Sequence, residues 1–74
     1  MLLRELTAGQ KFMFEDRRTP LAYAGKHGNY NSMGTFQYVG VGENGCPKLL
    51  HIEQNKALTV VPGTYYRSVL IILN

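Results

Sequence analysis

The residue types that could carry out chemistry are few in this chain and lie far apart along it. Cys46, His27 and His51 are the candidates for thiolate or imidazole metal ligands. The spacing from Cys46 to His51 is not that of a zinc finger, and a structural zinc site needs several converging ligands. A reactive thiolate needs a basic or cationic neighbour, and no pattern in the sequence brings either histidine next to the cysteine. The sequence therefore predicts neither a metal site nor covalent catalysis.

Two other patterns resemble catalytic or cofactor motifs but lack the context that these motifs need. The segment 40–45 reads G-x-G-x-x-G, which lets the backbone approach a pyrophosphate in dinucleotide-binding proteins. Pro47 and the short chain leave no complete βαβ unit after it, so we interpret the segment as a hairpin turn. Glu15 and Asp16 are adjacent, and adjacent residues of a strand point to opposite faces. We therefore expect a protein that is not an enzyme and that uses no cofactor.

A polar loop over residues 25–34 is the strongest candidate for binding. Its central tyrosine, Tyr30, stands between two asparagines, and an aromatic ring on a polar loop offers a stacking surface. Alternatively, Tyr30 folds back over one end of the core, and the Asn and Gly residues only form the turn. The sequence leaves both possibilities open. The candidate binding residues of this loop are Lys26, His27, Asn29, Tyr30 and Asn31.

Two further segments combine positive charge with exposure. Arg17 and Arg18 are adjacent in a connection before Pro20 and could reach phosphate groups. Tyr66 and Arg67 follow Tyr65 near the end of the chain. Because consecutive side chains alternate in direction, one of the two tyrosine rings should be buried and the other should be available for contact. We add Arg17, Arg18, Tyr66 and Arg67 to the candidate binding residues.

The charge balance gives only weak support for a polyanionic partner. The 74 residues include 8 Lys and Arg against 5 Asp and Glu, a net charge of +3. Nucleic-acid-binding faces cluster their basic residues, whereas here only Arg17 and Arg18 are adjacent. The charged fraction of 18% lies below the roughly 25% that is usual for soluble domains. A surface with so little charge is more typical of one that a partner partly covers.

Short strands separated by turn residues must position these candidates. The segment 47–58 permits two interpretations, a helix with Pro47 at its first position or a hairpin, and its alternation favours the hairpin. In that hairpin we expect Leu50 and Ile52 to face Leu58 and Val60. The last run, 69–73, is apolar on both faces and should be covered on both sides. We expect strands over 11–15, 21–24, 35–41, 48–53, 57–61 and 69–73, and a single helical turn over 2–6.

The strand spacing predicts one all-β domain over residues 1–74, a small five- to six-stranded antiparallel barrel or rolled sheet with at most one short helical turn. The stretch Val61-Pro62-Gly63-Thr64-Tyr65-Tyr66 before the last apolar strand resembles the Val-Pro-x-x-Tyr turn of the small five-stranded barrels of the Src-homology type. Peptide-binding members of that family also use an acidic first loop and a tryptophan, whereas this chain has Arg17-Arg18 in the comparable loop and no Trp. The resemblance therefore implies the barrel architecture alone.

Two functions fit these observations. The first is protein–protein interaction, as an adaptor or inhibitor of the kind found among small accessory proteins of phages and plasmids, or self-association into a homodimer through strand 69–73. The alternative is nucleic-acid binding by stacking tyrosines and dispersed basic residues. The residues that would serve nucleic-acid binding are Arg17, Arg18, Lys26, Tyr30, Lys48 and Tyr66.

The location of the protein can also be predicted. The single cysteine, the lack of a signal-like apolar start and the lack of a membrane-length apolar run predict a cytoplasmic location without membrane contact.

Overall fold

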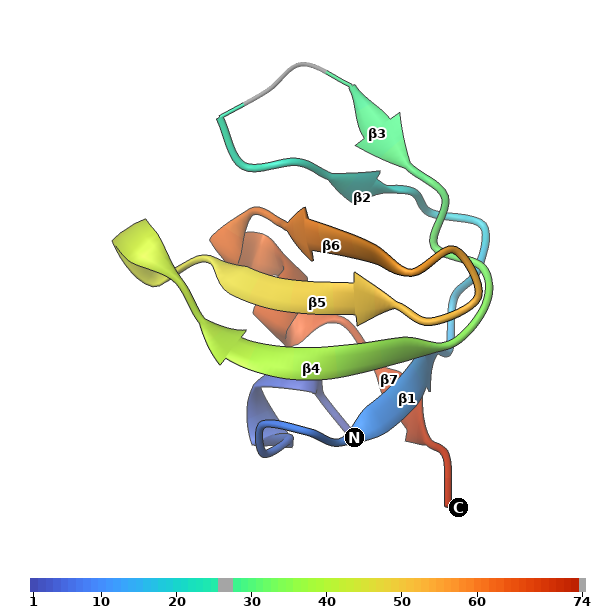
Figure 1. The fold of residues 1–74 in the computed structure, drawn as a ribbon. Helices are drawn as coiled ribbons and strands as arrows, with labels where there is room; N and C mark the ends of the chain where they lie inside the picture. The colour runs from blue at the N-terminus through green and yellow to red at the C-terminus, as the bar shows by residue number, and fades with distance from the viewer. Residues whose placement is uncertain (26–27, 74) are drawn as a thin grey trace.

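The fold is all-β, as the sequence predicts, with strands joined by tight turns and short 3₁₀ helices (Figure 1). The computed structural model describes residues 1–25 and 28–73. Every strand pairing within these residues is antiparallel. The elements are η1 (Leu3–Glu5), β1 (Lys11–Phe14), β2 (Leu21–Ala22), β3 (Asn29–Tyr30), β4 (Phe36–Val41), η2 (Glu43–Gly45), β5 (Pro47–His51), β6 (Lys56–Thr59), η3 (Pro62–Tyr66) and β7 (Val69–Ile71).

The strands form a five-stranded sheet in the order β6-β5-β4-β1-β7 and a separate two-stranded sheet, β2-β3. A bridge between Tyr23 and Val60 joins the small sheet to the strand end after β6. In Figure 1 the β2-β3 hairpin lies next to β6, at one edge of the large sheet. Strand β7 forms the opposite edge. The large sheet therefore has one edge that a hairpin covers and one edge formed by β7.

Alternating phenylalanines build the centre of the core. Phe12 and Phe14 point inward from β1, as their spacing predicts, and Phe36 meets them from β4. Their ring centroids lie 5.2 to 5.9 Å apart in edge and stacked arrangements, the separations that aromatic pairs favour. The buried cluster consists of Leu3, Leu6, Phe12, Phe14, Leu21, Phe36, Tyr38, Leu49, Leu58, Val60 and Val69.

The hairpin over 47–58 is confirmed, and the alternative of one helix is wrong. The expected side-chain facing is also wrong, because Leu49 pairs with Leu58 while Leu50 pairs with Ala57. Tyr38 of β4 lies opposite Leu49, and directly opposed residues share a face of the sheet. The buried face of β4 therefore turns Leu49 inward and leaves Leu50 only half-buried.

Two other expectations need correction. The polar loop 25–34 is not wholly irregular, because its residues Asn29–Tyr30 form β3 and pair with Leu21–Ala22. The last apolar run is not covered on both sides by the described residues. Val69 is buried, but Leu70 and Ile71 are 49% and 41% exposed. The strand ends at Ile71 and lies at the sheet edge, so only its inward residues can reach the core.

Candidate functional site

The structure divides the sequence-predicted binding residues among three places. Tyr30 lies on β3 against the end of the large sheet, with Asn29 and Asn31 exposed beside it. Arg17, Arg18 and Arg67 line one groove on another part of the surface. Tyr66 is 67% exposed and lies under the guanidinium of Arg4, which is 5.5 Å from the ring centroid. Lys26 and His27 lie outside the described residues.

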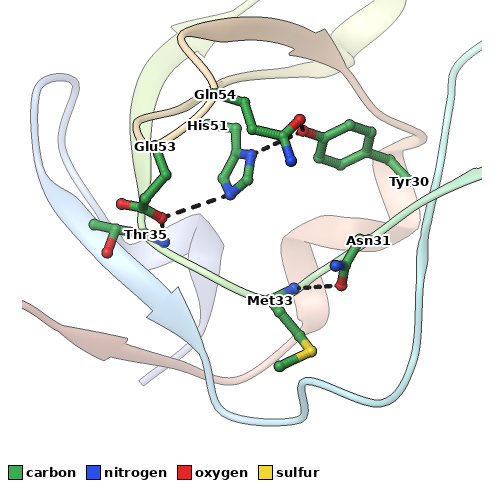
Figure 2. A network of polar contacts seen from close by, with 7 residues as sticks. All are labelled: Tyr30, Asn31, Met33, Thr35, His51, Glu53 and Gln54. Atoms are coloured by element: carbon green, nitrogen blue, oxygen red, sulfur yellow. Dashed lines mark hydrogen bonds and ion pairs between the residues drawn. The ribbon is translucent and has the colours of Figure 1, made fainter.

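Tyr30 belongs to a polar network that joins the β2-β3 hairpin to the large sheet (Figure 2). Its hydroxyl lies 2.8 Å from Nδ1 of His51 and donates to Oε1 of Gln54 at 2.6 Å. Its ring packs edge-on against those of Tyr23 and His51, with centroid distances of 5.9 and 5.5 Å. The tyrosine therefore folds back over the core, and its ring is half-buried and not free as a stacking platform.

The hydroxyl of Tyr30 has two partners in this network. It donates to Oε1 of Gln54 and lies within hydrogen-bond distance of Nδ1 of His51, so it links the turn after β5 to the buried ring of that strand. Burial raises the pKa of Tyr30 above its usual value, while the ammonium of Lys56, 5.0 Å from the ring centroid, opposes the shift. A tyrosine that keeps its proton is a weak nucleophile. The network is suited to holding two elements together and not to covalent chemistry.

The remaining members of the network are not among the binding residues that the sequence predicts, and His51 was expected only as a possible metal ligand. His51 is 4% exposed and stacks on Phe36 at 4.7 Å, and its Nε2 lies 3.6 Å from Oε1 of Glu53. The same carboxylate oxygen accepts the backbone N–H of Thr35 at 2.5 Å. His51 occupies the inward register of β5 with Pro47 and Leu49. The register that Phe36 and Tyr38 impose on β5 was therefore the signal that would have identified it.

A groove of about 730 Å³ lies where β1 ends and β7 begins. A backbone hydrogen bond from Glu15 to Ser68 at 3.0 Å closes this end of the strand pair. The side chains around the groove carry three positive and two negative charges. Its lining residues are Glu15, Asp16, Arg17, Arg18, Thr19, Arg67 and Ser68.

Arg67 is the most constrained residue of this groove. Its backbone N–H donates to Thr64, and its carbonyl accepts from Leu3. Its Nη2 donates to the carbonyl of Asp16 at 2.6 Å, and its guanidinium lies 4.4 Å from the ring centroid of the buried Phe14. Burial lowers the pKa of Arg67 below its usual value, although Asp16 opposes the shift. Its Nη1 is buried and has no hydrogen-bond partner among the described residues.

Asp16 organises the loop that carries the other two arginines. Its carboxylate accepts the backbone N–H of Arg18 at 2.9 Å and the hydroxyl of Thr19 at 2.6 Å. These hydrogen bonds, led by the one from Thr19, lower the pKa of Asp16 below its usual value. Nη2 of Arg17 contacts the sulfur of Met13. Both oxygens of the Asp16 carboxylate thus accept hydrogen bonds from within the loop.

The edge of β7 is a third distinctive surface. Leu70 pairs with Met13 of β1, and the N–H of Ile72 donates to Lys11 at 3.1 Å. Residues 69 and 71 therefore direct their backbone groups away from β1, and the N–H of Val69 donates to Met1 at 2.7 Å. Among residues 1–25 and 28–73, no backbone partner meets the outer edge at Ile71.

Other kinds of site are not evident in the part of the chain that the structure describes. No group of three His, Cys, Asp or Glu side chains there is placed to hold a metal ion. Cys46 is a free, buried cysteine, and its sulfur contacts the carbonyl of Asn44. None of the described helices is long and apolar enough to cross a membrane. Comparison of the chain with protein-family models, with curated proteins and with solved structures gave no match.

Proposed function

We propose that this chain is a non-enzymatic protein-interaction module that binds an extended segment of a partner as an added strand along the outer edge of β7. The observation that carries the proposal is the edge at Ile71, which has no backbone partner within residues 1–25 and 28–73, together with the apolar side chains around it. Leu70, Ile71 and Leu73 are 49%, 41% and 89% exposed. An exposed, apolar sheet edge is a template for another strand unless charge, proline or another element protects it.

The two edges of the large sheet differ in how far they are covered, and this difference favours β7 as the binding edge. The strand end after β6 is covered, because Ala24 donates to Thr59 at 3.0 Å and Val61 donates to Ala22 at 3.1 Å. At β7, the N-terminal segment covers only the start of the strand, through the bridge between Leu2 and Ser68. No Lys, Arg, Asp, Glu or Pro interrupts the run 69–73. A partner strand would satisfy the free backbone groups and cover the exposed apolar side chains.

The barrel architecture of the Src-homology type remains part of this proposal. It is supported by the turn at Val61-Pro62, which leads through η3 into β7. Nucleic-acid binding receives less support from the geometry. The ring of Tyr30 is packed against the core cluster, and Lys48 lies on β5, outside the arginine groove. The expected stacking residue and basic residues therefore do not share one surface.

Selection from a displayed library of random peptides tests the proposal. We expect the selected peptides to alternate apolar residues, and their binding should protect the amide of Ile71 from hydrogen exchange. Ile71→Pro removes an N–H that faces the free edge, a position where a strand tolerates proline, and should abolish binding. Ile71→Thr keeps the N–H and the β-branched shape and should preserve it, and circular dichroism verifies that both variants fold.

Three outcomes would contradict the proposal. The first is that the selected peptides bind Ile71→Pro as well as the parent chain. The second is that they shift only resonances remote from β7. The third is a concentration-dependent dimer in light scattering that Ile71→Pro dissociates, since the occupant of the edge would then be a second copy of this chain.

A further inference from the structure

We infer that the groove lined by Arg17, Arg18 and Arg67 is a binding site for a phosphate monoester on a partner polypeptide. The inference is independent of the β7 edge, because no residue of Val69–Ile71 lines the groove. It rests on the three guanidinium groups, on the fixed position of Arg67 and on the absence of aromatic side chains from the lining within residues 1–25 and 28–73.

The fixed guanidinium of Arg67 is the first step. Arg67 is held in place by its bond to the carbonyl of Asp16 and by its position over Phe14. Its Nη1 is buried and closed to a ligand in the groove, so the group contributes a positive charge in a fixed position to the groove wall. A charged group that is already held in place loses little side-chain entropy when an anion binds.

The arrangement of charges in the groove favours binding of a single compact anion. Arg17, Arg18 and Arg67 face Glu15 and Asp16 as the charged lining residues. The carboxylate of Asp16 is bound by the N–H of Arg18 and the hydroxyl of Thr19, so it competes little for the guanidinium groups. A phosphate monoester presents several acceptor oxygens and close to two negative charges at neutral pH, which an arginine cluster can match.

The lining also distinguishes the class of partner. Proteins that bind single-stranded nucleic acid place aromatic rings beside their basic groove, so that bases can stack. Among residues 1–25 and 28–73, no Phe, Tyr or His lines this groove, and the ring of Tyr66 lies with Arg4 outside it. Glu15 and Asp16 would repel the further phosphates of a polynucleotide. A single phosphorylated side chain of a polypeptide fits both conditions.

Titration of the full chain, followed by amide resonances, tests the inference. The probes are inorganic phosphate, a phosphoserine peptide, the same peptide without phosphate, and an oligothymidylate. We expect the phosphopeptide to give saturable shifts confined to Glu15–Thr19, Arg67 and Ser68, and the unmodified peptide to give none. Affinity should rise as pH increases through about 6, where the phosphate gains its second charge.

Charge-matched variants separate a site from general attraction. The double variant Arg17→Gln/Arg18→Gln should weaken phosphopeptide binding at least tenfold. The double variant Arg4→Gln/Lys48→Gln removes the same charge outside the groove and should change affinity less than twofold. Arg67→Lys keeps the charge but loses the planar fork of donors, and it should also weaken binding about tenfold. Thermal denaturation verifies that each variant is folded.

Four results would overturn the inference. They are the absence of saturation with the phosphopeptide, equal losses in the two double variants, an unmodified peptide that binds as well as its phosphorylated form, and an oligothymidylate that binds the groove more tightly than the phosphopeptide. The last result would assign the groove to nucleic acid. Because no residue of β7 is altered, failure here would leave the strand-addition proposal standing.

Discussion

The hydroxyl of Tyr30 and Nδ1 of His51, which are 21 residues apart in sequence, lie 2.8 Å from each other. Tyr30 belongs to the two-stranded sheet and His51 to the five-stranded sheet. Their contact therefore joins the two sheets at the end opposite β7. It also satisfies one ring nitrogen of a buried histidine, and a polar group inside a core is tolerated when it has a hydrogen-bond partner.

Removing this hydroxyl should destabilise the fold. Tyr30→Phe leaves Nδ1 of His51 without this hydrogen-bond partner, and we expect the free energy of unfolding to fall by about 1–3 kcal/mol. Tyr66→Phe is the control, since Tyr66 is 67% exposed, and its effect should stay within about 0.5 kcal/mol. Urea denaturation measures both. Equal effects of the two substitutions would show that the network contributes nothing specific.

Gly34 should be the least replaceable of three glycines. Its φ is +98°, and a Cβ there would lie 2.5 Å from Nε2 of His51 and 2.6 Å from Oε1 of Glu53. Gly34→Ala therefore combines backbone strain with a clash, and we expect a loss of about 2–4 kcal/mol.

Two other glycines separate these causes. Gly9 has a φ of +95° but open space around it, so Gly9→Ala should cost only the strain, about 1 kcal/mol. Gly63 has neither a positive φ nor a close neighbour, so Gly63→Ala should be close to neutral. Thermal denaturation of the three variants gives the ranking, and a neutral Gly34→Ala would contradict the packing of the network.

Substitution of two adjacent leucines tests the register of β5. Leu49 is fully buried at 0% exposure opposite Tyr38 and Leu58, so Leu49→Ala should cost about 2–5 kcal/mol. Leu50 is only half-buried on the outer face, and Leu50→Ala should cost about 1 kcal/mol or less. Denaturant unfolding measures both. The reverse order would support the facing that the sequence pattern alone suggests.

Acid should loosen the arginine-bearing loop. Hydrogen bonds from Thr19 and Arg18 lower the folded-state pKa of Asp16 below its usual value of 3.8. A lowered pKa means that the loop is stabilised above the unfolded value and loses this contribution as pH falls through the folded one. An amide-proton titration of Arg18 should report the transition. In Asp16→Ala the transition should be absent, and its persistence there would assign it to another carboxyl group.

Alkali should destabilise the protein through Tyr65. Burial, with a smaller contribution from the neighbouring Tyr38, raises the pKa of Tyr65 from its usual 10.0 to about 12. The unfolded chain releases this proton first, so the free energy of unfolding should fall as pH rises from 10.0 towards 12. Unfolding at several alkaline pH values measures the slope. Tyr65→Phe should flatten it, and an unchanged slope would exclude Tyr65 as the cause.

Local patterns in the sequence determined the class of fold and much of its detail. The alternation of Phe12 and Phe14 predicted the inward face of β1, and the glycine-rich segment 40–45 predicted the turn after β4. Both are short-range properties, set by the two-residue period of a strand and by the residues that accept a positive φ. Tyr65 packs against the core and Tyr66 is exposed, as expected, but both lie in η3, where the turn of a 3₁₀ helix and not strand alternation separates their directions.

Only the tertiary structure decided which of two equally apolar residues faces the core and which distant residues become neighbours. Leu49 and Leu50 are adjacent and equally apolar, so either could face inward, and only pairing with Tyr38 on β4 selected Leu49. The same pairing buried His51 against Phe36 and brought it to Tyr30. Arg17 and Arg67 share a groove because β1 and β7 pair along their length, a contact between residues some 50 positions apart. Long-range strand register therefore determined both the Tyr30–His51 network and the arginine groove. The two-residue period of a strand carries no information about which strands become neighbours.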